Sequence, residues 1–211
     1  MQQTRRGRLA ASLVSLVAWT GLALLLAARI DRLDGQVLPA LWSNARFFTD
    51  LSNLLIAGVF GLLALAPRRV PAVLYGTPLV STIMATGVYY GLLGGLQALG
   101  TDGVGDVIAH AVVPALVVLH WLLFTEPGKF RRGDLLMWVG FPVLYCAYAL
   151  VRGALTSQFP YFFLNFNRLG AVAVLLYVLA IAIAVVVIGL AVIQVDRRLR
   201  RSSARSLAIE R

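Results

Sequence analysis

Two reactive side chains, Thr49 and His110, lie where two long apolar stretches of the sequence begin. Thr49 belongs to Arg46-Phe-Phe-Thr-Asp-Leu-Ser-Asn53, at the start of the second stretch, and His110 belongs to Asp106-Val-Ile-Ala-His-Ala-Val-Val-Pro114, at the start of the fourth. A hydroxyl next to an imidazole can act as a nucleophile whose proton the imidazole removes. The elements that carry these residues decide whether the two groups can meet.

The composition indicates a membrane protein. Apolar residues make up 60% of the 211 positions and charged residues only 13%, whereas a soluble domain has about half apolar and about a quarter charged residues. A transmembrane helix needs about 20 mainly apolar residues, and six stretches of the chain meet this requirement. The connections between them are too short to bury a core of their own. We therefore expect a single all-helical domain with six spans.

The expected spans cover about 9–28, 47–66, 74–99, 107–124, 135–151 and 169–195, and a basic tail follows at 196–211. An even number of spans puts both ends of the chain on one side. That side would carry 14 of the 19 Lys and Arg residues, against 5 on the other side. The positive-inside rule then places both termini in the cytoplasm. The net charge of +10 is explained by contacts with anionic lipid head groups, so we expect membrane lipids as partners and no nucleic acid.

This topology brings Thr49 and His110 to the outer boundary of the hydrocarbon, within about one helical turn of each other in depth. Asn53 follows Thr49 by four residues and shares its helix face, and Asp106 precedes His110 by four and can hydrogen-bond its ring. In a catalytic triad a third group orients the base. Asp106 or Asp50 could fill that role, and Asn53 could donate a hydrogen bond to an oxyanion.

A non-catalytic interpretation explains the same residues. A threonine in a membrane helix usually bonds to its own backbone or packs between helices, and an aspartate at a helix start usually caps it. The alternative is therefore a multi-pass protein that binds lipid or a partner, in which Thr49 and His110 only bridge helices. A distance under about 4 Å between Thr49 Oγ1 and a ring nitrogen of His110, across a closed cavity, would favour catalysis.

No cofactor or metal site is expected. The second histidine, His120, is ten residues beyond His110 and turned away from it on a straight helix, so the two cannot share one ligand. Cys146 is the only cysteine and is expected to be a small apolar core residue. A transporter is also disfavoured, because the spans lack paired interior charges.

The outer loop before the last span, residues 158–167, is rich in aromatic side chains. It is either an interfacial aromatic belt or a cap that covers the mouth of the bundle and excludes water. Both interpretations put it on the same side as Thr49 and His110.

Three motifs together resemble a known family. They are Phe-Phe-Thr at 47–49, His110 with Pro114 four residues later, and Pro-Tyr-Phe-Phe-Leu at 160–164. In this order they resemble the androgen-induced and androgen-dependent TFPI-regulating membrane proteins, and most closely the bacterial relatives of that family. The resemblance covers roughly residues 45–187.

The animal members of that family are threonine hydrolases of fatty acid esters of hydroxy fatty acids. The resemblance implies that Thr49 is the nucleophile, that His110 is the base, that a lipid ester is the substrate, and that the chain lies in a bacterial inner membrane. The animal segment before the last span resembles Tyr-Pro-Phe-Leu-Glu, whereas here Pro160 is displaced and Asn165 replaces the acid. The particular ester is therefore not carried over.

Overall fold

The structure is a computed structural model that describes residues 3–95 and 103–209. Within these ranges the chain is helical and has no strands. Six helical stretches are long and apolar enough to cross a membrane, as expected from the sequence. They are α1 (Arg5–Arg32), α3 (Phe48–Leu65), α4 (Ala72–Leu92), the run of α5 (Gly103–Val107), η3 (Ile108–Val112) and α6 (Val113–Phe124), α7 (Leu135–Thr156), and α9 (Ala171–Ile209).

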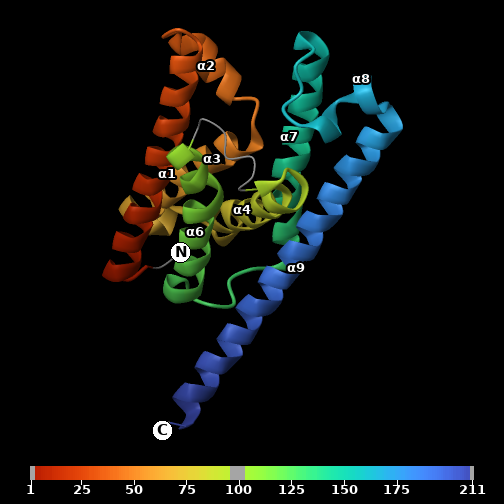
Figure 1. Cartoon of the computed structure of the whole chain (residues 1–211). Coiled ribbons are helices and arrows are strands. Elements are labelled where there is room, and N and C mark those ends of the chain that lie inside the picture. Colours follow the sequence, from red (N-terminus) through yellow and green to blue (C-terminus); the bar gives the residue numbers. More distant parts are fainter. Residues whose placement is uncertain (1–2, 96–102, 210–211) are drawn as a thin grey trace.

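Short helices connect these spans. They are α2 (Val37–Asn44), η1 (Pro67–Arg69), η4 (Arg132–Asp134), η5 (Phe162–Leu164) and α8 (Phe166–Leu169). Helix α1 begins and α9 ends at the lower end of Figure 1, and α2 and α8 lie at the upper end.

The largest differences from the expected boundaries are at the ends of the third and sixth spans. The third span was expected to reach residue 99, but α4 ends at Leu92, because Gly94 and Gly95 adopt positive φ angles of 87° and 56°. Residues 96–99 lie outside the described ranges. The basic tail expected at 196–211 begins inside α9, which continues to Ile209 as one helix.

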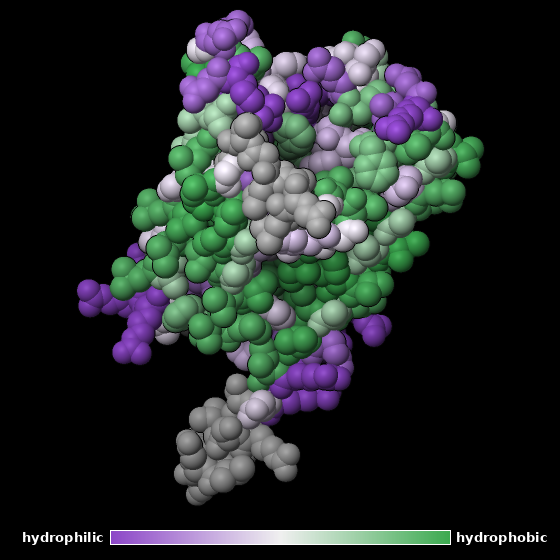
Figure 2. All heavy atoms as spheres, in the orientation of Figure 1, coloured by the Kyte–Doolittle hydropathy of each residue, from purple (hydrophilic) through white to green (hydrophobic). Residues whose placement is uncertain are grey.

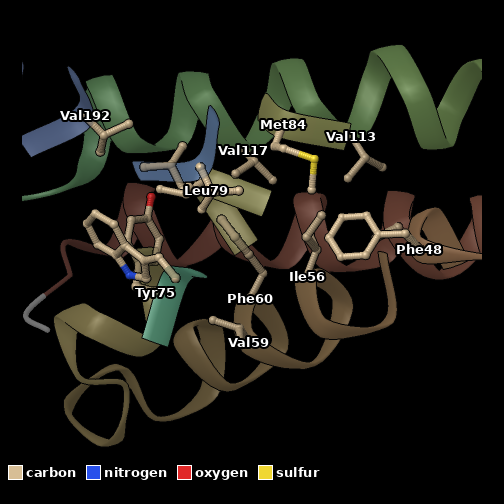
Figure 3. Close-up of a cluster of buried hydrophobic side chains, with 14 of the residues drawn as sticks. Phe48, Ile56, Val59, Phe60, Tyr75, Leu79, Met84, Val113, Val117 and Val192 are labelled. Carbon is tan, nitrogen blue, oxygen red and sulfur yellow. The ribbon is translucent and has the colours of Figure 1, made fainter. Parts of the chain in front are cut away.

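Helix α4 lies at the centre of the bundle and contacts α3, α6, α7 and α9, while α1 packs along α3. The side chains between these helices are large and apolar. Phe60, Tyr75, Leu79 and Val117 are fully buried in this core (Figure 3). A bundle held by such packing fixes the relative positions of the helix ends, where the polar residues lie.

Large apolar side chains also cover the outside of the bundle, which is where a bilayer would contact it. Leu16, Leu123, Leu144 and Val172 are each at least half exposed. Figure 2 shows a broad hydrophobic surface between hydrophilic groups at the two ends. In lipid this exposure carries no hydrophobic penalty, because the surroundings are apolar.

A buried polar network lies near the start of α1. His120 Nε2 is 3.1 Å from the carbonyl oxygen of Gly7, which only accepts, so this nitrogen carries the proton. Nδ1 then accepts from the hydroxyl of Tyr75 at 3.0 Å, and that hydroxyl accepts from Thr125 at 3.1 Å. Every polar atom of the His120 ring therefore has a permanent partner within the protein.

Candidate active site

Thr49 is the second residue of α3, and the connection that precedes it is anchored from α7. The hydroxyl of Tyr145 donates to the carbonyl oxygen of Arg46 at 2.7 Å, and that of Tyr148 donates to Ala45 at 3.0 Å. The N-cap residue of α3 is Phe47, whose side chain makes no capping hydrogen bond. The first N–H groups of a helix lack intrahelical partners, so Thr49 stands where the positive end of the helix dipole faces the site.

His110 lies in η3, a single π-helical stretch inside the fourth span. Pro114 has no N–H and cannot bond the carbonyl oxygen of His110, four residues earlier. This carbonyl instead accepts from the hydroxyl of Thr86 on α4 at 3.4 Å, and the N–H of Val113 bonds Ile108, five residues back. The His–Pro spacing seen in the sequence thus has a local consequence, because it distorts the helix at the histidine.

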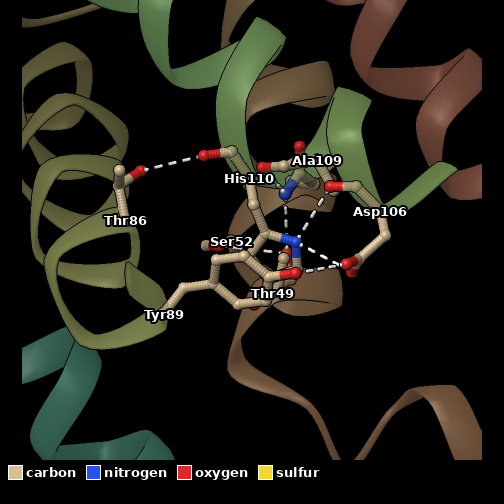
Figure 4. A network of polar contacts seen from close by, with 8 residues as sticks. Thr49, Ser52, Thr86, Tyr89, Asp106, Ala109 and His110 are labelled. Carbon is tan, nitrogen blue, oxygen red and sulfur yellow. Dashed lines mark hydrogen bonds and ion pairs between the residues drawn. The ribbon is translucent and has the colours of Figure 1, made fainter. Parts of the chain in front are cut away.

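The hydroxyl of Thr49 and the ring of His110 are in direct contact (Figure 4). Thr49 Oγ1 lies 3.0 Å from His110 Nε2. His110 Nδ1 lies 3.0 Å from the backbone oxygen of Asp106 and 3.0 Å from its carboxylate Oδ1. Both of these oxygens only accept, so Nδ1 carries the proton and Nε2 presents its lone pair to the Thr49 hydroxyl. This is the protonation pattern that a nucleophile, its base and an orienting carboxylate require.

Tyr89 of α4 contacts both His110 and Asp106. Its ring stacks on the His110 ring with centroids 3.8 Å apart and planes 20° apart, and its hydroxyl donates to Asp106 Oδ2. The imidazole is therefore fixed in position by a carboxylate and an aromatic face. The sequence offers a weak signal for Tyr89, since a hydroxyl on an apolar helix needs a partner.

The two other expected support residues have different positions. Asn53 is buried, and its amide nitrogen donates to the carbonyl oxygens of Thr49 at 2.9 Å and Ala109 at 3.4 Å. It therefore joins α3 to η3 and does not face the cavity, unlike the oxyanion donor expected from the sequence. Asp50 lines the cavity and interacts electrostatically with Arg29 and His110, whereas the carboxylate bonded to the ring is that of Asp106.

Thr49 and His110 line a cavity of about 330 Å³. Each of the six spans contributes to its wall, as shown by Leu25, Phe48, Met84, His110, Tyr145 and Ile181. Most of the wall is apolar, with a few convergent polar groups. A pocket of this kind is suited to a small apolar ligand with one reacting polar group.

The aromatic loop between α7 and α9 closes one side of this cavity. Pro160, Tyr161, Phe162 and Phe163 all belong to the wall. Tyr161 and Phe163 stack with centroids 5.1 Å and planes 9° apart, and Phe163 is buried. This arrangement corresponds to a cap over the site and not to a belt that faces only lipid.

Positive side chains lie close to the cavity and the connection above it. Arg29 belongs to the cavity wall, and its Nε donates to Asn44 Oδ1 at 3.0 Å. Burial, together with Arg29 and Arg152 nearby, lowers the pKa of Arg46, which donates to Gln158 at 3.0 Å. Arg46 remains charged at neutral pH, because a guanidinium does not lose its proton in proteins.

Comparison of the chain with protein-family models, curated proteins and solved structures found no match. Within residues 3–95 and 103–209, no three His, Cys, Asp or Glu side chains converge as a metal site would require. The fold defines a multi-pass, all-helical membrane protein.

Proposed function

We propose that this protein is an intramembrane hydrolase of lipid or fatty-acyl esters, with Thr49 as the nucleophile and His110 as the general base. The contact of 3.0 Å between Thr49 Oγ1 and His110 Nε2, in the wall of an apolar cavity, is the observation that carries the proposal. The bond from His110 Nδ1 to Asp106 supports it, because this bond keeps the proton off Nε2.

The reaction has two steps. In the first, His110 takes the proton of Thr49, Oγ1 bonds to the ester carbonyl carbon, and the alcohol leaves with the proton from His110. In the second, His110 takes a proton from water, the hydroxide attacks the acyl-threonine, and the carboxylic acid departs as Thr49 regains its proton. Asp106 stabilises the imidazolium that forms in both steps.

The surroundings of the pair fit an acyl substrate. The cavity wall is mainly apolar, and the outer surface of the bundle is also apolar, so a lipid would reach the site from the bilayer. The excess of Lys and Arg on the side of the termini favours cytoplasmic ends and a site in the outer half of the membrane. The resemblance to the androgen-induced family supports the same reaction, and its bacterial relatives suggest a bacterial inner membrane.

A fluorophosphonate probe with an alkyl chain tests this function on the purified full-length protein in detergent. Thr49 Oγ1 would bond to phosphorus, fluoride would leave, and His110 would take the proton. We expect labelling of the wild type and complete loss of labelling in Thr49→Ala. The matched control is Thr20→Ala, because the Thr20 hydroxyl is exposed on α1 and bonds only its own helix, at Leu16.

Labelling that persists in Thr49→Ala, or a wild-type protein that does not react, would contradict the proposal. If Thr49→Ala lowers thermal stability in detergent and no ester turnover is found in the wild type, Thr49 and His110 are helix-bridging residues of a non-catalytic protein.

A further inference from the structure

The hydroxyl of Tyr161 lies beside the reacting pair and has no role in the two steps above. Tyr161 comes from the loop between α7 and α9 and lines the cavity. Its hydroxyl oxygen accepts a hydrogen bond from the backbone N–H of Phe48 at 3.0 Å, across 113 positions of sequence. Thr49, the residue after Phe48, lines the same cavity as Tyr161.

The directions of these hydrogen bonds determine what Tyr161 can do. The Phe48 N–H is a donor, so the Tyr161 oxygen accepts there and its own hydrogen remains available for another acceptor. Tyr145 gives its hydrogen to the carbonyl oxygen of Arg46, and Thr49 gives its hydrogen to His110. Neither of these neighbouring hydroxyls can therefore donate to Tyr161 in this arrangement. The hydrogen of the Tyr161 hydroxyl can therefore be donated to a group bound in the cavity.

We propose that Tyr161 is a further catalytic residue, whose hydroxyl donates a hydrogen bond to the oxyanion that forms when Thr49 attacks the ester carbonyl. This inference rests on the proposed hydrolase function. In the tetrahedral intermediate, the oxyanion and Thr49 Oγ1 are bonded to the same carbon atom, and they lie closer together than the length of one hydrogen bond. The Tyr161 hydroxyl lines the same cavity and lies 3.0 Å from the backbone nitrogen of the residue before Thr49, so it is placed to donate to an oxyanion that forms next to Thr49.

Two features prepare Tyr161 for this role. Burial raises its pKa to about 12, so the phenol keeps its proton at neutral pH and remains a donor. The bond from the Phe48 N–H, together with the stack on Phe163, fixes the direction of the hydroxyl before substrate arrives. A donor that is oriented in advance stabilises the transition state without the cost of reorganisation.

The test compares inactivation by the alkyl fluorophosphonate in wild type, Tyr161→Phe and Tyr177→Phe. The Tyr161→Phe change should lower the maximal inactivation rate about 100-fold, while the probe concentration for half-maximal rate changes by less than about two-fold. Tyr177→Phe is the matched control, because Tyr177 of α9 does not line the cavity and its ring contacts with Phe162 and Phe163 are kept when only the hydroxyl is removed. It should react at the wild-type rate.

A second variant separates catalysis from folding. Replacement of Tyr161 by 3,5-difluorotyrosine keeps the ring and the hydroxyl but makes the hydroxyl a stronger donor, so the inactivation rate should equal or exceed that of the wild type. The inference is overturned if Tyr161→Phe reacts at the wild-type rate, or if the difluorotyrosine protein is as slow as Tyr161→Phe. In both cases the hydrolase function itself stands, provided that the wild type is labelled at Thr49. A wild type that is not labelled overturns both.

Discussion

His110 and His120 lie in the same membrane-spanning stretch, yet their surroundings differ in one respect that matters for chemistry. Both rings have a partner at each nitrogen, and in both rings these partners fix the tautomer. His110 accepts from an aliphatic hydroxyl in the wall of a cavity. His120 accepts from Tyr75 inside the packed core, and neither residue lines that cavity.

Under the proposed function, this difference means that a buried histidine with satisfied hydrogen bonds also needs a neighbouring hydroxyl and a cavity to act as a base. The network at His120 joins α1, α4 and α6 through hydrogen bonds to Gly7 and Tyr75, as a structural bridge between helices does. The group at His110 adds the aliphatic hydroxyl of Thr49 and a cavity. Mutations near the two histidines should therefore have different effects. Changes near His110 should alter reactivity, and changes near His120 should alter stability.

The largest effect that would distinguish the regions is expected from Asp106→Asn. The amide group cannot hold the Nδ1 proton as a carboxylate does, while the backbone oxygen of Asp106 still can. We expect the fluorophosphonate labelling rate to fall by about 10²–10⁴-fold. Asp134→Asn is the control, because the Asp134 carboxylate also accepts a hydrogen bond, from the backbone N–H of Arg131, but lies in η4 and does not line the cavity. An unchanged rate in Asp106→Asn would show that Asp106 does not orient the base.

A smaller effect, on stability alone, is expected from Tyr75→Phe. This change leaves His120 Nδ1 without its donor and Thr125 without its acceptor in the core, which costs about 1–3 kcal/mol of unfolding free energy. The labelling rate should stay the same. Denaturant titration in detergent measures the loss, with Tyr90→Phe as a control, because Tyr90 is on the same helix and 40% exposed. Loss of labelling in a folded Tyr75→Phe protein would remove the distinction between the two regions.

The smallest effect is expected from Asn53→Ala. This change should lower both the labelling rate and the stability. The hydrogen bonds from the Asn53 side-chain amide to the carbonyl oxygens of Thr49 and Ala109 are lost, which lowers the unfolding free energy by about 1 kcal/mol. Because Ser52 also bonds the Thr49 carbonyl at 3.0 Å, the nucleophile is only partly released, and we expect the labelling rate to fall about 10-fold. Asn167→Ala, at an exposed position, should match the wild type in both assays. A loss as large as that in Thr49→Ala would make Asn53 a participant in the reaction.

Much of the fold follows from the sequence, because the length of an uncharged apolar run decides whether a helix can cross a membrane. The six spans were predicted on this basis, and the structure confirms six such helices. The end of α4 was not predicted, since Gly94 and Gly95 are apolar enough to extend the run but adopt backbone angles that end the helix. Hydropathy measures transfer into lipid and carries no information on φ.

The candidate site could be predicted in part. The i to i+4 spacing of Asp106 and His110 predicts their contact, because residues at this spacing share a helix face. The spacing of Asn53 predicts the helix face that it shares with Thr49, but not which carbonyl oxygen its side-chain amide meets. The position of Tyr161 next to Phe48 and Thr49 could not be predicted, because Tyr161 belongs to a loop that lies 113 residues after Phe48 in the sequence.

The cavity wall contains residues from the first span to the last, from Leu25 to Ile181, and this has a consequence for biosynthesis. Until α9 has been synthesised, the cavity around Thr49 lacks the part of its wall that α9 supplies. Under the proposed function, Thr49 would become reactive only after α9 had docked and completed the cavity. Co-expressed fragments divided between α7 and α9 should regain labelling only when the two pieces associate.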